Sequence, residues 1–184
     1  MAIEKYVTPC FVIEGYDQGE HDRAYKLFTR EFGMIVVHAK SIRKLESKLR
    51  AHVLPRSVSL VTLVQGREVW RLVGSEEQHI DTRGIHDVTA LLKRFIRGEG
   101  EHKVLYDRLI EFLKTASMYD QKMSRVALYY LILVELGYTD VKIIGAKSMK
   151  EYKTWSIDDI YTHLVLSFDA VRHHIHEVMK EMQL

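Results

Sequence analysis

Residues 57–73 read SVSLVTLVQGREVWRLV, and this stretch decides the first half of the fold. Apolar residues alternate with others through 57–64, as expected for a strand with one buried face. Gln65 and Gly66 supply turn chemistry, and a second alternating run follows at 67–73. The pattern therefore predicts a β-hairpin between 57–64 and 67–73.

Three more short runs precede this hairpin. They cover residues 6–16, 22–29 and 34–39, and glycine-containing turns separate them. Five short strands joined by such turns are typical of a small barrel or sandwich. Cys10 lies on the first of these strands, directly after Pro9, and we expect it to be a buried, unreactive thiol.

The pattern becomes helical after residue 83. Apolar residues recur at spacings of three and four in 88–96 and again in 105–116, and residues 123–136 are apolar almost all round. Gly137 follows as a helix stop. The sequence therefore predicts an α+β chain in two parts, a β-domain over residues 1–83 and an α-helical bundle domain over residues 84–184.

The last stretch, residues 157–182, has a heptad pattern. Ser156 and Asp159 have the spacing of a capping box at its start. Two interpretations of the heptads stay open: a helix packed on the rest of the bundle, or a self-pairing coiled coil that would make a homodimer. The apolar seam consists of Ile157, Tyr161, Leu164, Phe168, Val171, Ile175, Val178 and Met182.

Composition restricts the kind of protein. The chain has 184 residues, of which 47% are hydrophobic and 28% charged, an ordinary globular composition. A single cysteine excludes an internal disulfide and a zinc site of several thiolates. The sequence has neither an apolar run long enough to span a membrane nor the pattern of a signal peptide at residues 1–10. We therefore expect a soluble cytoplasmic protein without membrane contact.

The common motifs of enzymes are missing from the sequence. It contains neither a P-loop nor GxGxxG, GxSxG or HExxH. Asp169, His173 and His176, with His174 beside them, could chelate a metal, form an exposed helix face or contact a partner, and we favour the exposed face. We expect no enzymatic activity, no metal and no cofactor.

Positive charge is concentrated in the β-domain. Between residues 22 and 71, eleven basic residues stand against four acidic ones, whereas residues 84–184 are balanced. The densest part is 40–56, between the third and fourth expected strands. The eleven basic residues are Arg23, Lys26, Arg30, Lys40, Arg43, Lys44, Lys48, Arg50, Arg56, Arg67 and Arg71.

A basic groove on a small barrel is a common way to bind single-stranded nucleic acid, because fixed cations replace the counterions of the phosphates. Aromatic side chains that stack on bases add to such binding. Trp70 lies between Arg67 and Arg71, so it is the first candidate for stacking. The alternative interpretation of the charge is a solvated basic loop that binds nothing.

Residues 11–49 read FVIEGYDQGEHDRAYKLFTREFGMIVVHAKSIRKLESKL and contain three short motifs. GE-x-DR covers 19–23, LFTREFG covers 27–33, and AK-x-x-RK with a later SK covers 39–48. In order and spacing these motifs resemble the N-terminal domain of the RecO family of bacterial recombination mediators and DNA repair proteins, and the resemblance extends over residues 11–77. Residues 136–138, LGY, are similar to the end of that family's central helix.

The resemblance implies a five-stranded OB-fold β-barrel followed by a helical domain. It also implies a non-enzymatic protein of the bacterial cytoplasm and nucleoid that binds single- and double-stranded DNA and promotes strand annealing in DNA repair and DNA recombination after DNA damage. The implied partners in recombinase loading are RecR and SSB, the single-stranded DNA-binding protein. The candidate DNA contacts are Arg30, Lys40, Arg43, Lys44 and Lys48, then Arg50, Arg56, Arg67 and Arg71, with Trp70 for stacking.

Two features depart from the family. Many members follow LGY with a four-cysteine zinc module, whereas residues 141–155, VKIIGAKSMKEYKTW, contain no cysteine. The family glycine after AK is Ser41 in this chain. Because an OB fold serves many roles, a protein-interaction adaptor and an RNA-binding protein are the alternative functions.

Overall fold

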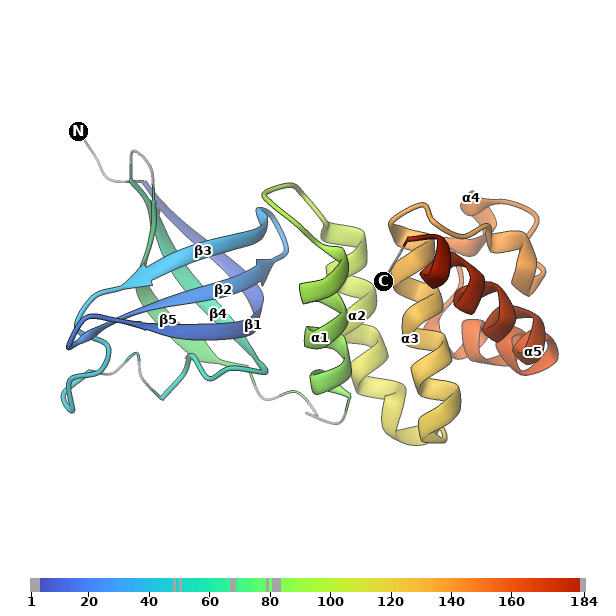
Figure 1. Cartoon of the computed structure of the whole chain (residues 1–184), viewed down its shortest axis with the longest axis horizontal. Coiled ribbons are helices and arrows are strands. Elements are labelled where there is room, and N and C mark those ends of the chain that lie inside the picture. The colour runs from blue at the N-terminus through green and yellow to red at the C-terminus, as the bar shows by residue number, and fades with distance from the viewer. Residues whose placement is uncertain are drawn as a thin grey trace. The chain divides into compact units, whose positions relative to one another are not determined.

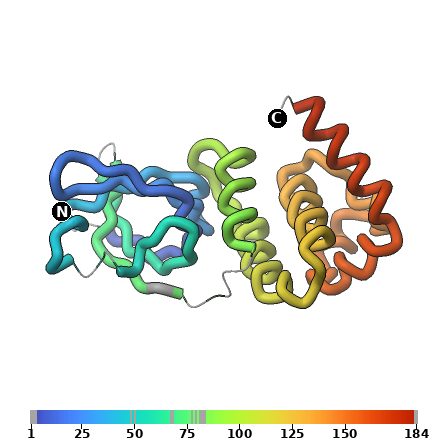
Figure 2. Tube along the Cα trace, turned by 60° about the horizontal axis from the view of Figure 1, so that its bottom comes forward, coloured from blue at the N-terminus to red at the C-terminus, as the bar shows by residue number. Residues whose placement is uncertain are grey.

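Strands fill the first part of the chain and helices the rest (Figure 1 and Figure 2). The computed structural model describes residues 4–47, 49, 51–66, 69–78, 80 and 84–182. Contacts between residues divide the chain into two units, Met1–Tyr106 and Asp107–Leu184. Within the described ranges, no helix is both long enough and apolar enough to cross a membrane.

The first unit is built on five strands: β1 (Lys5–Gln18), β2 (Asp22–Thr29), β3 (Gly33–Ala39), β4 (Ser57–Gln65) and β5 (Trp70–Glu77). They close into a barrel in the order β1-β2-β3-β5-β4 (Figure 1). Neighbouring strands are antiparallel except β3 and β5, whose parallel pairing closes the barrel. A small five-stranded barrel of this kind, followed by helices, confirms the predicted fold class.

The hairpin predicted from the sequence is present. β4 and β5 pair antiparallel, with Leu63 opposite Leu72 and Gln65 opposite Trp70, so the second strand begins at Trp70 and not at residue 67. Every second side chain along the strands points into the barrel, and these apolar side chains, Cys10 among them, form one core. Cys10 is fully buried, which confirms the expected buried cysteine, and this burial raises the pKa of its thiol.

An irregularity in β1, between Val12 and Glu14, decides which later side chains face outward. Val12 points into the barrel core. After the irregularity Gly15 lies opposite the core residue Tyr25, so the next residue, Tyr16, faces outward and is 44% exposed. Without the extra residue, alternation from Val12 would place Tyr16 inside.

Gly33 starts β3 at a position that favours glycine on two grounds. Its φ of 68° lies in the left-handed region, and a Cβ there would lie 2.3 Å from the carbonyl oxygen of Gly100. The approach is close because Gly100 N–H donates to the carbonyl oxygen of Phe32 over 3.0 Å. Gly33 ends the LFTREFG motif, so the motif encodes a close backbone contact beside the β2–β3 turn.

One helix packs on the barrel within the first unit. α1 (Ile85–Phe95) lies against β1, with Val88 and Leu92 fully buried and Lys93 paired with the Glu14 carboxylate. α2 (Lys103–Thr115) crosses the division between the units. The expected domain boundary after residue 83 therefore lies at the change from strand to helix, whereas the units divide between Tyr106 and Asp107.

The second unit is framed by α3 (Gln121–Glu135) and α5 (Ile157–Glu181), which pack on each other. Short helical turns accompany them: η1 (Ala116–Met118), η2 (Val141–Ile144) and α4 (Met149–Tyr152). Asp120 caps the start of α3. Gly137 ends that helix with a φ of 78°, and Gly137 N–H and Tyr138 N–H donate to carbonyl oxygens of its last turn, so the predicted stop is confirmed.

α5 begins with the predicted capping box, in which Ser156 and Asp159 each accept a hydrogen bond from the other's backbone N–H. Most of its apolar seam is covered within this one chain, since six of the eight residues, Leu164 and Val171 among them, are buried while Phe168 and Met182 are partly exposed. This burial favours the packed helix over the self-pairing coiled coil. The helix also breaks at Ser167, whose φ of −123° and ψ of 19° are not helical.

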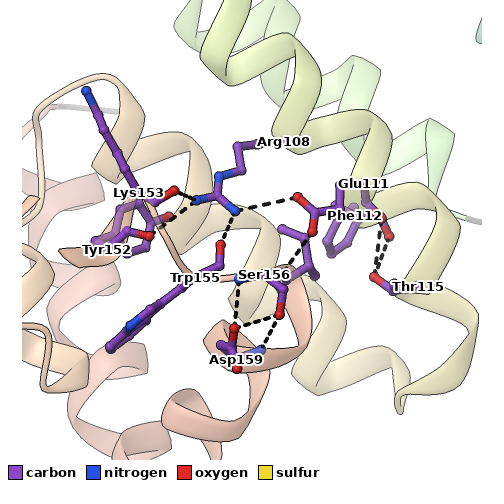
Figure 3. Close-up of polar contacts among 10 residues, drawn as sticks. Arg108, Glu111, Phe112, Thr115, Tyr152, Lys153, Trp155, Ser156 and Asp159 are labelled. Carbon is purple, nitrogen blue, oxygen red and sulfur yellow. Dashed lines mark hydrogen bonds and ion pairs between the residues drawn. The ribbon is translucent and has the colours of Figure 1, made fainter. Parts of the chain in front are cut away.

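Arg108 of α2 holds the start of α5 in place from inside the second unit (Figure 3). The residue is 8% exposed, and its guanidinium donates to the backbone oxygens of Tyr152 at 3.2 Å and Lys153 at 3.3 Å. It also donates to the backbone oxygen of Trp155 and lies 3.5 Å from the Glu111 carboxylate. These bonds fix the connection between α4 and α5.

Candidate nucleic-acid interface

Four cross-strand partners form a row on the outside of the barrel. Tyr16 of β1 lies opposite Ala24 of β2, Ala24 lies opposite His38 of β3, and His38 lies opposite Arg71 of β5. Directly paired residues point to the same face of a sheet, so the four side chains share the outer face of the barrel. Ala24 is only 3% exposed, so Tyr16, His38 and Arg71 are the members of the row that solvent reaches. With strands about 4.8 Å apart, this outer row is about 14 Å long.

Cationic side chains flank the outer row. Lys26 and Val36 are the next outward pair along β2 and β3, and Lys40 follows His38 by two residues. Lys40 and Arg71 are both exposed. Among the residues that the structure describes, neither forms an ion pair. Both charges are therefore available to an anion that lies along the row.

The aromatic member of the outer row stays neutral at ordinary pH. Tyr16 donates its hydroxyl hydrogen to the Glu14 carboxylate, and partial burial together with this bond raises the pKa of Tyr16 to about 12. His38 Nδ1 lies 2.7 Å from the side-chain oxygen of Gln18. A neutral, half-exposed phenol ring is a surface on which a base can stack.

Asp17 partly neutralises two arginines at the end of the barrel where the outer row lies, and strand alternation places Asp17 and Arg23 on the inner face next to that row. Its carboxylate accepts a hydrogen bond from Arg23 at 2.8 Å and lies 3.6 Å from the Arg43 guanidinium. The bond from Arg23 lowers the pKa of Asp17, so the carboxylate stays charged in moderate acid. Arg43 also donates to the carbonyl oxygen of Gly19 over 3.1 Å and thereby ties the loop after β3 to the β1–β2 turn.

Three of the predicted DNA contacts gather at this end of the barrel, together with the paired Arg43. Lys40 follows β3 directly, Arg71 lies beside His38, and the exposed Lys44 belongs to the turn behind Lys40. Ser41, which stands where the family has glycine, keeps a left-handed backbone with a φ of 53°. The turn after β3 therefore keeps its left-handed residue although Ser41 replaces the family's glycine.

Arg30 and Arg56 lie elsewhere on the barrel. Arg30 belongs to the β2–β3 turn, so the whole of β3, roughly 20 Å of strand, separates it from Lys40. Arg56 precedes β4, whereas Arg71 lies opposite Val64 near the other end of that strand. The predicted residues therefore do not form one continuous surface.

Trp70 is not available for stacking, which corrects the prediction. It is 6% exposed and packs inside the barrel, with its ring centroid 4.8 Å from that of Phe32 and 5.7 Å from that of Tyr6. Trp70 and Arg71 are consecutive on a strand, so they point to opposite faces. The predicted contacts Lys48, Arg50 and Arg67 lie outside the described residues.

Three members of the surface were not selected from the sequence: Tyr16, Lys26 and His38. His38 is two residues before Lys40, so strand alternation counted back from Lys40 would have found it. Alternation across the hairpin would also have placed Trp70 inside with Leu72. Tyr16 gave no such signal, because the irregularity in β1 reverses its orientation.

The histidines of α5 do not form a metal site with nearby acids. In the described ranges, no group of three or more His, Cys, Asp and Glu side chains is placed to hold a metal ion. Asp169 and His173 are exposed on α5, and Arg172 lies 4.0 Å from the Asp169 carboxylate. The arrangement fits the exposed helix face favoured from the sequence.

Comparison with known proteins gives matches that centre on the barrel. The family model described as "Recombination protein O N terminal" matches residues 1–76. The DNA repair protein RecO of Dehalococcoides mccartyi strain CBDB1 is 34% identical over 71 residues, which cover 39% of this chain and 28% of that protein. The DNA repair protein RecO of Polaromonas sp. strain JS666 is 24% identical over 139 residues, which cover 70% of this chain and 56% of that protein.

The matched stretches therefore span between about a quarter and about half of the length of these curated relatives. The shared part includes the three motifs around β2 and β3 and the whole of the closed barrel. Residues 1–76 are thus similar to the N-terminal domain of the RecO family.

Proposed function

We propose that this chain is a non-enzymatic DNA-binding protein of bacterial DNA repair, which binds single- and double-stranded DNA and promotes strand annealing and recombinase loading. The observation that carries the proposal is the outer row with its flanking cations, where an exposed tyrosine and unpaired Lys40 and Arg71 share one face of an OB barrel. The relatives named DNA repair protein RecO support the same role.

The chemistry of the surface suits binding without sequence preference. Lys40, Lys44 and Arg71 can neutralise phosphates, and Tyr16 offers a ring on which any base can stack. Contacts to phosphates position a strand but read no sequence. Annealing needs this arrangement, because base edges that the protein does not occupy can pair with a second strand.

The proposal includes partners as well as DNA. Annealing in the cell starts from strands coated with SSB, and recombinase loading would involve RecR, so the protein would act at the nucleoid in the bacterial cytoplasm. Co-sedimentation of the full chain with purified SSB and with purified RecR tests this part, and the absence of both complexes at micromolar concentrations would contradict it.

The DNA site is tested by the salt dependence of binding to a single-stranded oligonucleotide. Replacing two phosphate contacts in Lys40→Ala/Arg71→Ala should lower the slope of log K against log salt by about 1.4. The matched control Lys114→Ala/Lys180→Ala removes the same charge from exposed positions of the second unit and should leave the slope unchanged. Equal slopes for the wild type and the first variant would refute the site.

Stacking and annealing are tested separately. Tyr16→Ala should weaken single-strand binding by about 1–3 kcal/mol, whereas Tyr16→Phe keeps the ring and should bind like the wild type. Lys40→Ala/Arg71→Ala should also slow the annealing of SSB-coated complementary strands. Tighter binding to RNA than to DNA of the same sequence and salt would favour the RNA-binding alternative instead.

A further inference from the structure

A second group of cations lies in the helical unit, on the segment that stands where many family members carry a zinc module. Lys142, Lys147, Lys150 and Lys153 are all exposed. Residues 141–155 contain a single acid, Glu151. The overall charge balance of the second half of the chain therefore conceals a local excess of three positive charges. We call these four residues the lysine patch.

The local structure holds the lysine patch outward. Ile144 and Tyr152 are buried and anchor the two ends of the segment. The Glu151 carboxylate accepts the Lys147 N–H over 2.7 Å, so the acid serves as a local cap and faces its own turn. Ser148 caps the turn of α4 by accepting the Glu151 N–H. The segment is thus a capped structure with a defined surface.

Arg108 adds rigidity at the second end of the segment. It donates to the backbone oxygens of Tyr152 and Lys153, while the Lys153 side chain extends away from it (Figure 3). The main chain of Lys153 is therefore fixed and its ammonium group remains in solvent. Fixing the main chain in advance removes part of the conformational freedom that Lys153 would otherwise lose on binding an anion.

An aromatic pair lies next to the lysine patch in the chain. Trp155 and His163 stack with ring centroids 4.0 Å apart and an interplanar angle of 9°, and both rings are partly exposed. Cations beside a stacked aromatic pair are the combination by which proteins hold single strands without sequence preference. An acidic peptide would use the cations but would gain less from planar stacking.

We propose that the lysine patch, together with Trp155 and His163, is a second binding site for single-stranded nucleic acid, built entirely within the helical unit. This inference rests on the proposed function, since it supplies the second strand for annealing. One strand would bind the outer row of the barrel and the other the lysine patch. The four lysines contact phosphates and the aromatic pair extends a base stack.

The main experiment uses the full chain and two non-complementary single-stranded oligonucleotides, one with a donor dye and one with an acceptor dye. The wild type should hold both strands in one complex and give energy transfer, and light scattering should show one protein chain per two strands. Lys150→Gln/Lys153→Gln should lose at least four-fifths of the transfer.

The matched control Lys114→Gln/Lys180→Gln removes the same charge at other exposed positions of the helical unit and should keep the transfer. Equal melting temperatures of the two variants, measured by circular dichroism, would show that loss of transfer is not loss of folding. Unchanged transfer in Lys150→Gln/Lys153→Gln would overturn the inference, as would transfer that occurs only in complexes with two protein chains.

Different results would refute the proposed function and the second site at the lysine patch. If the wild type binds no strand, the proposed function fails and the second site with it. If Lys40→Ala/Arg71→Ala weakens binding of one strand while the lysine patch variant changes nothing, only the second site fails. A poly-glutamate peptide that binds the wild type more tightly than the oligonucleotide, and loses binding in the patch variant, would assign the patch to a protein partner and overturn the inference.

Intrinsic fluorescence gives an independent measurement. The chain has two tryptophans, so Trp70→Phe leaves Trp155 as the sole emitter. Saturation with single-stranded DNA should quench that emission, because bases then lie against the ring. The quenching should disappear when Lys150→Gln/Lys153→Gln is added. Unchanged emission at saturation would overturn the role of the aromatic pair.

Discussion

The barrel and the helical unit use the same type of residue in opposite ways. On the barrel, Arg71 is exposed beside the outer row. In the helical unit, Arg108 is 8% exposed and donates its hydrogen bonds to backbone oxygens at the α4–α5 connection. One arginine is therefore placed to bind a partner, and the other replaces missing backbone bonds inside the fold. A count of charges along the sequence does not distinguish them.

The two units also differ in how they treat other polar groups. The closed barrel satisfies its backbone through the strand ladder, and its core is apolar. In the described part of the helical unit, the hydroxyl groups of Tyr130 and Tyr152 and one oxygen of Glu135 are buried without a hydrogen-bond partner in the chain. Buried polar atoms without a partner lower stability, and most of those in the described residues lie in the helical unit.

The largest expected effect is in the helical unit. Arg108→Met should cost about 3–5 kcal/mol of unfolding free energy, because it leaves buried backbone oxygens without donors. Arg172→Met is the matched control, since Arg172 is exposed and its pair with Asp169 should contribute less than about 1 kcal/mol. Urea unfolding followed by circular dichroism measures both variants, and equal stabilities would break the contrast between the units.

The barrel should be most sensitive at a backbone contact. Gly33→Ala should cost about 3 kcal/mol, because the added Cβ collides with Gly100 and the backbone has a positive φ. Gly19→Ala has a similar φ of 61° but open space around its Cβ, so it should cost about 1 kcal/mol. Thermal unfolding of both variants measures the difference, and equal costs would show that the collision is relieved by movement of the 98–100 segment.

A pH-dependent effect is expected at Glu135. Burial raises the pKa of this carboxyl group in the fold, against the opposing influence of Arg108 and Lys153. Below the unfolded pKa the carboxyl group is protonated in both states, so its burial carries no penalty for burying a charge. The free energy of unfolding then falls as the pH rises from the unfolded pKa through the higher folded pKa. Glu135→Gln should raise stability by about 1 kcal/mol at pH 8 and by much less at pH 4. Melting temperatures at both pH values test this, and an equal gain at each would contradict it.

Asp17→Asn should change stability least among these variants and should increase affinity for DNA. Asp17→Asn releases Arg23 and Arg43 from a shared carboxylate, so affinity for single-stranded DNA at low salt should rise by about threefold to tenfold. Glu20→Gln removes the same charge from the adjacent β1–β2 turn without releasing an arginine, and should change affinity less. Fluorescence anisotropy compares the two, and equal gains would mean that Asp17 acts through net charge alone.

Several elements of the fold and some residues of the candidate site could be predicted from the sequence. The strands, the β4–β5 hairpin, the Gly137 stop and the Ser156 capping box follow from local patterns, and all are present. Lys40 and Arg71 were selected from charge together with the family resemblance, and they lie together on one face. Arg30 and Arg56 were selected by the same criterion and lie elsewhere, because charge density carries no information about which end of a strand a residue occupies.

The sequence by itself determined the elements, the family resemblance and the part of the chain in which positive charge is dense, because these depend on periodicity, short motifs and composition. The tertiary structure alone decided which side chains share a surface. It buried Trp70 and turned Tyr16 outward through one extra residue in β1. It also placed Arg108 inside the fold while Lys150 and Lys153 stayed outside. The physical reason is that register, strand irregularities and burial depend on contacts between residues far apart in the chain.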